Sequence, residues 1–113
     1  MLSRLLRREN YVVHEAADAE TALQVFESTP IAVVICDMKL PGRNGDWLIE
    51  QVRNRFPTTA IILATGDSAV PPRVYLQRGV VGYLLKPFTA EAVRGIVRDA
   101  MVWNQVAKRN LSI

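Results

Sequence analysis

The sequence is poor in the residues that mark several common classes of site. It has one cysteine and one histidine in 113 residues, and no hydrophobic run of membrane-spanning length. The single cysteine, Cys36, excludes an internal disulfide and favours a reducing, cytoplasmic setting. No Gly-x-Gly-x-x-Gly motif follows a predicted strand, which leaves a dinucleotide-binding fold without support. The net charge of +3 comes without a dense basic face carrying aromatics, so we expect no direct nucleic-acid binding and no membrane association.

What the chain does contain is the composition of an ordinary globular domain, with 50% hydrophobic and 22% charged residues. Its length fits one domain with a sizeable core. We expect residues 1–107 to form that domain and residues 108–113 to be a short C-terminal tail, too short for an effector domain.

Hydrophobic periodicity predicts strands and helices in alternation. The predicted strands are Tyr11–Ala16, Ile31–Cys36, Ala60–Ala64 and Val80–Leu85. The predicted helices are a short one around Leu2, Leu5 and Leu6 that ends at Glu9-Asn10, Asp18 as N-cap through Ser28, Asp46–Phe56, Pro71 to about Gly79, and Thr89 to between Val106 and Lys108. Such alternation is typical of an α/β fold in which helices cover both faces of a parallel sheet, a three-layer α/β/α arrangement.

Three polar side chains stand at the carboxyl ends of three predicted strands, namely Asp37, Thr65 and Lys86. Parallel strands bring these ends to one edge of the sheet, where ligands bind in open α/β folds. A carboxylate that attacks phosphorus needs its developing charge balanced, and a lysine and a hydroxyl are suitable partners. Taken singly, however, Asp37 could be a loop or capping residue and Lys86 a solvated surface lysine.

Three segments together resemble the receiver domain of bacterial two-component response regulators. They are Asp-Met-Lys-Leu-Pro-Gly-Arg-Asn-Gly from Asp37, Ala-Thr-Gly around Thr65, and Gly-Tyr-Leu-Leu-Lys-Pro-Phe around Lys86. Their order and spacing agree with that family over essentially the whole chain. The resemblance implies that Asp37 is the phosphoacceptor, that Thr65 is the switch hydroxyl and that Lys86 pairs with the phosphate. The donor is then a sensor histidine kinase or phosphotransfer protein, in a cytoplasmic phosphorelay.

The same resemblance assigns roles to further residues. Tyr83 is similar to the aromatic switch of the family, Lys39 would lend its backbone carbonyl to Mg²⁺ beside Asp37, and Pro87 would follow Lys86 through a cis peptide bond. The implied fold is the flavodoxin-like doubly wound parallel sheet. Such a domain is not an enzyme, beyond phosphorylating and dephosphorylating itself. An aspartyl-nucleophile phosphatase carries a second acid two residues after the first, where this chain has Lys39.

The chain departs from the family at its start. A receiver opens with a central strand that ends in a pair of acidic residues holding Mg²⁺, and about twenty residues including that strand are missing here. Since Mg²⁺ prefers several hard oxygen ligands, we expect metal binding and phosphotransfer to be impaired. The alternative function is a phosphorylation-independent module for protein interaction or dimerisation.

A missing central strand exposes backbone groups and an apolar slot, which something must fill. Residues Tyr11–Ala16 could move against Ile31–Cys36, bringing Glu15 and Asp18 closer to Asp37. A strand of a second copy could pair there, giving a homodimer, or the natural chain could start upstream. The output would pass to a downstream protein partner or effector domain.

Overall fold

The computed structural model describes residues 2–37, 45–66 and 79–110. Its helices are α1 (Leu2–Arg8), α2 (Ala19–Ser28), α3 (Gly45–Arg55) and α5 (Ala90–Asn110), and its strands are β1 (Val33–Asp37), β2 (Ala60–Thr65) and β3 (Val80–Leu85). These elements confirm most of the predicted alternation. The helix predicted from Pro71 falls on residues 67–78, outside the described part of the chain. No helix in the described ranges is long and apolar enough to cross a membrane.

The three strands form one parallel sheet in the order β1-β2-β3. Strand β2 lies in the middle and every one of its residues is buried. Its unbroken apolar run suits this place, because a parallel strand covered on both faces has no polar side. Strand β1 occupies an edge, and four of its five residues are only partly buried.

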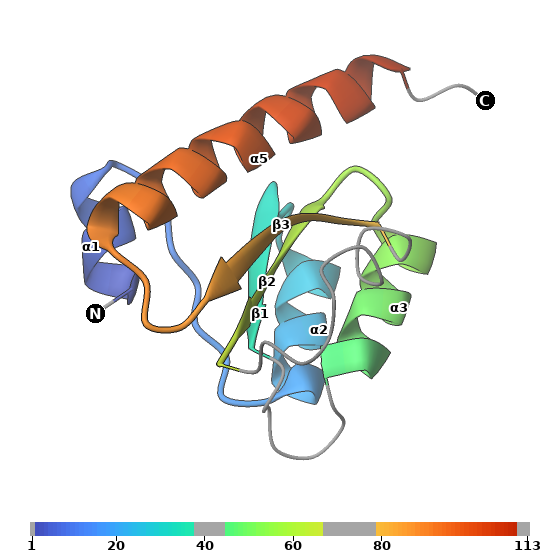
Figure 1. Cartoon of the computed structure of the whole chain (residues 1–113). Coiled ribbons are helices and arrows are strands. Elements are labelled where there is room, and N and C mark those ends of the chain that lie inside the picture. Colours follow the sequence, from blue (N-terminus) through green and yellow to red (C-terminus); the bar gives the residue numbers. More distant parts are fainter. Residues whose placement is uncertain (1, 38–44, 67–78, 111–113) are drawn as a thin grey trace.

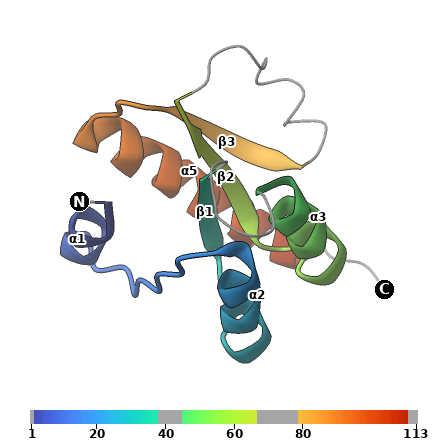
Figure 2. The same cartoon turned by 90° about the horizontal axis from the view of Figure 1, so that it is seen from below.

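Helices cover both faces of the sheet, as predicted (Figures 1 and 2). On one face α2 and α3 pack through a core that includes Phe26, Leu48 and Val52. On the other face α5 lies across the strands, with buried side chains of α1 in the same core. Gly82 of β3 allows the close approach of α5, because a Cβ at this position would lie 2.8 Å from the Ile96 side chain. This packing yields the three-layer α/β/α architecture.

The prediction of a strand at Tyr11–Ala16 is wrong. This segment forms neither a helix nor a strand of the sheet, and Val12 is 86% exposed. The physical reason is a cavity that separates the segment from β1, so the backbone partner that a strand needs is out of reach. Closure of the sheet by this segment is therefore not the arrangement that the chain adopts.

The last helix is longer than its periodicity predicts. Helix α5 continues to Asn110 and so includes residues 108–110, which the sequence places in the tail. Lys108 and Arg109 stand in its last turn, where positive charge interacts favourably with the helix dipole. This electrostatic interaction stabilises the last turn of the helix, beyond the apolar residues that define its buried face.

Asp18 begins α2 as predicted. Its Oδ1 accepts a hydrogen bond of 2.7 Å from the Thr21 backbone N–H, and this bond lowers the pKa of Asp18. We expect Asp18→Ala to lower the melting temperature by a few degrees, because an N–H of the first turn loses its acceptor. Thermal unfolding followed by circular dichroism measures this, with Gln24→Ala at an exposed position of the same helix as control. Equal melting temperatures for Asp18→Ala and the parent chain would contradict the capping role.

Candidate functional site

The strand register places the predicted site residues at one edge of the sheet. Asp37 ends β1 and lies opposite Ala64, while Thr65 ends β2 and lies opposite Leu85. The backbone N–H of Lys86 donates to the Thr65 carbonyl over 2.8 Å, which holds the start of the loop after β3 against β2. Three segments far apart in the sequence therefore meet at the carboxyl ends of the strands.

An ion pair joins two of these residues. Lys86 Nζ lies 2.6 Å from Asp37 Oδ2, within charge-assisted hydrogen-bond distance. Both side chains are about 40% exposed, 40% for Lys86 and 41% for Asp37. The carboxylate therefore has a fixed counter-charge and remains open to a small molecule from the solvent.

Thr65 and Tyr83 occupy different depths beside this pair. Thr65 is only 5% exposed, at the buried end of β2. Tyr83 is partly buried and packs against the core shared by α2, α3 and the sheet. The Lys86–Pro87 peptide bond is cis, as the sequence implies. The structure thus brings Asp37, Thr65 and Lys86 to one rim, with Tyr83 on β3, three residues before Lys86.

The described residues do not fit a Mg²⁺ site. Asp37 contributes one carboxylate, and its Oδ2 is already paired with Lys86. Glu15 and Asp18 line the cavity that reaches Asp37, yet Glu15 pairs with Arg7 over 3.6 Å and Asp18 caps α2. No three metal-ligating side chains cluster within residues 2–37, 45–66 and 79–110. Lys39, the predicted carbonyl ligand, lies outside the described residues.

Cys36 lies beside the site, although in the sequence it only excluded a disulfide and indicated a reducing setting. It is 2% exposed, and its Sγ lies 3.8 Å from the Asp37 carbonyl oxygen. Burial raises the pKa of the Cys36 thiol to about 12, and the carboxylates of Asp37 and Asp46 add to the rise. Asp46, in the first turn of α3, is thus close enough to the end of β1 to act on it. In the sequence, the position of Asp46 just after the loop that follows Asp37 could have indicated this closeness.

The raised pKa of Cys36 predicts a loss of stability at high pH. The folded protein keeps the thiol neutral. The stabilisation that this group gives the folded state is therefore complete below pH 9, near the pKa of the thiol in the unfolded chain, and declines as the pH rises towards 12. We expect the free energy of unfolding to fall by up to about 1.4 kcal/mol per pH unit above pH 9 through this group. Denaturant unfolding at pH 8 and pH 10 measures the fall, and the Cys36→Ala variant should lack this part of it. An identical fall in both proteins would contradict the assignment.

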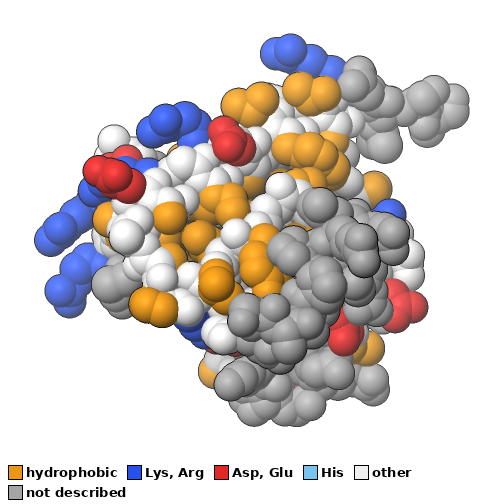
Figure 3. Space-filling view, viewed as in Figure 1, with side chains coloured by type: hydrophobic (Ala, Val, Ile, Leu, Met, Phe, Trp, Pro, Cys, Tyr) orange, Lys and Arg blue, Asp and Glu red, His pale blue; other side chains and the backbone are white. Residues whose placement is uncertain are grey.

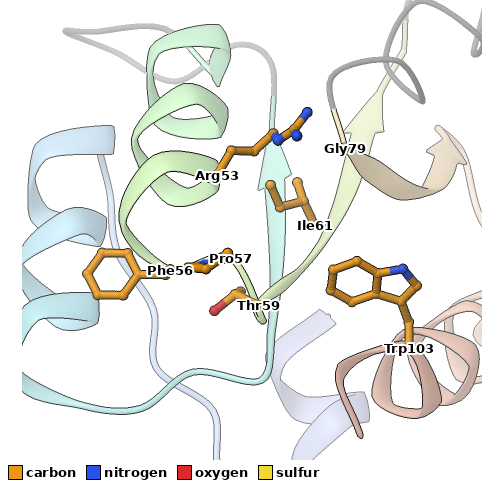
Figure 4. Close-up of a pocket in the computed structure, with 7 residues that line it drawn as sticks. All are labelled: Arg53, Phe56, Pro57, Thr59, Ile61, Gly79 and Trp103. Carbon is orange, nitrogen blue, oxygen red and sulfur yellow. The ribbon is translucent and has the colours of Figure 1, made fainter. Parts of the chain in front are cut away.

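A small pocket of about 120 Å³ lies at the other end of the sheet, where β2 and β3 begin (Figure 4). Arg53, Phe56 and Pro57 line it from the end of α3, and Trp103 faces it from α5. No acidic side chain lines this pocket, and it is remote from the carboxyl ends of the strands. It takes no part in the rim site.

Known proteins match the chain in sequence and in structure. Residues 1–98 match the family model described as the response regulator receiver domain. The sensory transduction protein RegX3 of Mycolicibacterium smegmatis is 31% identical over 88% of this chain and 44% of its own length. The response regulator protein FleR of Pseudomonas aeruginosa is 38% identical over 70% of this chain and 17% of its own length. The chain thus spans less than half the length of these curated relatives.

Solved structures agree with the fold. A CheY-like response regulator receiver domain protein from Methanospirillum hungatei superposes with a TM-score of 0.85 at 24% identity, over 93% of this chain and 85% of the other. A response regulator structure from Chloroflexus aurantiacus superposes with a TM-score of 0.83 at 30% identity, over 90% of this chain and 86% of the other. The flavodoxin-like α/β fold predicted from the sequence is therefore confirmed.

Proposed function

The chain belongs to the family of response regulator receiver domains of two-component systems, and we propose that Asp37 is its phosphoacceptor. The observation that carries the proposal is the 2.6 Å ion pair between Lys86 and Asp37. It joins two residues that are 49 positions apart in the sequence, at the edge of the sheet where the family resemblance places the chemistry. The proposed donor is a phosphohistidine on a sensor histidine kinase or a phosphotransfer protein.

The proposed step is a transfer of one phosphoryl group. A carboxylate oxygen of Asp37 forms a bond to phosphorus while the bond from phosphorus to the donor imidazole nitrogen breaks, and the imidazole leaves with that electron pair. Negative charge on the transferring oxygens is stabilised by the Lys86 ammonium. The Thr65 hydroxyl is the proposed hydrogen-bond donor to the phosphoryl group once it is in place, and Tyr83 is the proposed switch.

We propose that this transfer is slow. The described residues contain no cluster of three metal-ligating side chains, whereas Mg²⁺ requires several oxygen ligands. Among the described residues, Lys86 is then the positive charge that pairs with Asp37 at the rim, and its partial exposure allows water to weaken its effect. No step of the proposed reaction depends on a metal.

The proposed output surface is formed by β3 and α5. Figure 3 shows hydrophobic side chains gathered over α5 and the region below it, and large exposed ones include Leu85, Val102, Trp103 and Val106. An apolar patch on a small domain is typical of a protein interaction site. We propose that the receiver unit extends past residue 107 to the end of α5 at Asn110, and that this surface contacts a downstream protein or an effector domain in the cytoplasm.

The second candidate function is an interaction module that works without phosphorylation. The pairing of Glu15 with Arg7, and the engagement of Asp18 in its helix cap, favour it because neither acid is free to complete a metal site. In that case Asp37 and Lys86 serve only to hold β1 and β3 at the rim. Neither candidate is an enzyme.

The deciding experiment is the intact mass of the chain after incubation with acetyl phosphate, with and without Mg²⁺. We expect a single phosphoryl adduct that accumulates slowly and with little dependence on Mg²⁺. Asp37→Ala should carry none, while the control Asp99→Ala, which removes an exposed acid of α5, should behave as the parent. An unmodified parent chain would overturn the phosphoacceptor proposal and favour the interaction module.

A further inference from the structure

The small pocket where β2 and β3 begin combines a cation, an indole and an apolar floor. Arg53 reaches it from α3 and Trp103 from α5, and the 2% exposed Ile61 of β2 lies between them (Figure 4). Thr59 also lines the pocket, but its hydroxyl already donates to the Ile31 carbonyl over 2.7 Å. Among the described residues of the lining, Arg53 is therefore the one charged group that can meet a ligand.

The Arg53 side chain lies against the backbone at the start of β3. A Cβ on Gly79 would stand 2.7 Å from Arg53 Nε and 2.8 Å from its Cζ, so the guanidinium can lie there because this residue is a glycine. Within residues 2–37, 45–66 and 79–110, no acidic side chain pairs with Arg53, whereas Arg55 in the same turn of α3 pairs with Glu27. The guanidinium is thus positioned by packing and has no counter-charge in the described part of the chain.

Trp103 is held on the other side of the pocket through its neighbour in the helix. Asn104 is 1% exposed, and its Nδ2 donates to the Thr58 carbonyl over 2.6 Å, which ties α5 to the loop between α3 and β2. The same loop supplies Pro57 and Thr59 to the lining. The two sides of the pocket are therefore fixed by contacts within the domain, so a ligand need not order them on binding.

The size of the pocket limits a ligand to about one ring. Its volume is about 120 Å³, whereas a cavity of about 150 Å³ holds benzene and drug-sized ligands occupy roughly 300–1,000 Å³. A nucleotide or a large cofactor is therefore excluded. A planar ring suits the indole and the apolar floor, and a carboxylate suits the planar guanidinium, which can donate two parallel hydrogen bonds to it.

We propose that this pocket binds a small aromatic monocarboxylate. The ring of the ligand lies between the Trp103 indole and Ile61, and the carboxylate accepts hydrogen bonds from Arg53. The pocket lies at the end of the sheet opposite to Asp37 and Lys86, so this binding does not depend on phosphorylation. Because α3 and α5 cover opposite faces of the sheet, the ligand joins the two outer layers of the domain (Figure 2).

The test is a titration of the full chain with sodium benzoate at constant ionic strength, followed by the two indole N–H signals in ¹H–¹⁵N correlation spectra. We expect a saturable shift of the Trp103 signal with a dissociation constant on the order of 1 mM. Trp47, in the first turn of α3 at the other end of that helix, is the internal control, and its signal should not move. The spectrum of Trp103→Phe assigns the two signals.

Two further probes separate the contributions of the ring and the charge. Sodium acetate has the carboxylate without the ring, and benzyl alcohol has the ring without the charge. We expect each to bind at least about tenfold more weakly than benzoate, because each loses one of the two contacts. An equal affinity for either probe would contradict the proposed class of ligand.

A pair of arginine variants locates the carboxylate. Arg53→Gln should weaken benzoate binding at least about tenfold, because the carboxylate loses its charged donor. Arg98→Gln removes the same charge from an exposed position of α5 and should leave the affinity unchanged. Both arginines are exposed, and circular dichroism checks that both variants fold.

Three outcomes of these measurements would overturn the proposal. The first is a Trp103 signal that does not shift or does not saturate. The second is an equal shift of the Trp47 signal, which means that benzoate does not select the pocket. The third is an equal affinity of Arg53→Gln and Arg98→Gln for benzoate, which means that binding does not depend on the guanidinium in the pocket.

Discussion

Replacing Lys86 with alanine should slow phosphorylation of Asp37 by acetyl phosphate at least about tenfold while leaving the stability of the domain almost unchanged. Loss of one preorganised donor costs about 10²–10³ in rate at a water-excluded site, and the partial exposure of Lys86 reduces that effect here. An exposed ion pair contributes only about 0–1 kcal/mol to the free energy of unfolding. Rate and stability should therefore respond very differently to this change.

A second surface ion pair provides a matched control. Arg55 Nη2 lies 2.9 Å from Glu27 Oε2, with side-chain exposures of 43% and 49%, and the pair joins the C-terminal ends of α2 and α3. Glu27→Ala, which removes this pair and leaves Arg55 over the Phe56 ring, should leave the rate of adduct formation unchanged and alter stability as little as Lys86→Ala does. Intact mass against time gives the rate, and urea unfolding gives the stability. A Lys86→Ala chain that reacts at the parent rate would show that the ammonium takes no part in the transfer.

The order of elements and the rim site were predictable because both depend on local sequence. Unbroken apolar runs that end in a polar residue predict β1 with Asp37 and β2 with Thr65, and a parallel sheet then brings the strand ends together. The Lys86–Asp37 pair follows from that edge, although its distance does not. The roles of Asp37, Thr65, Lys86 and Tyr83 stay predictions until chemistry tests them.

The fate of Tyr11–Ala16 was not predictable, because a strand depends on its partner. The local pattern of this segment favours a strand, but the segment forms neither a helix nor a strand. Whether it pairs with β1 is decided by α1 and α2, whose buried Leu6 and Phe26 line opposite sides of the cavity. Sequence periodicity contains no information about a gap between two elements that are far apart in the chain.

The cavity beside β1 should make the free-energy cost of truncating an isoleucine that borders it smaller than the cost at the opposite isoleucine of β2. Ile35 of β1 and Ile62 of β2 are partners in the register and contribute to the same core. Ile62 is fully buried, so Ile62→Ala should cost about 3–4 kcal/mol in the free energy of unfolding. Ile35 is only partly buried and borders the cavity, so Ile35→Ala should cost about 1 kcal/mol.

The two alanine substitutions should differ in cost because the surroundings of Ile62 and Ile35 differ. Deleting methyl groups from Ile62 leaves a new void between packed layers, and its neighbours lose contacts that nothing replaces. Deleting them from Ile35 only enlarges a space that already exists. Urea unfolding of both alanine variants measures the two costs, and the milder Ile62→Val and Ile35→Val pair keeps the comparison possible if Ile62→Ala does not fold. Equal free-energy costs for Ile35→Ala and Ile62→Ala would mean that Ile35 is enclosed in solution, and hence that the cavity beside β1 is filled or closed in solution.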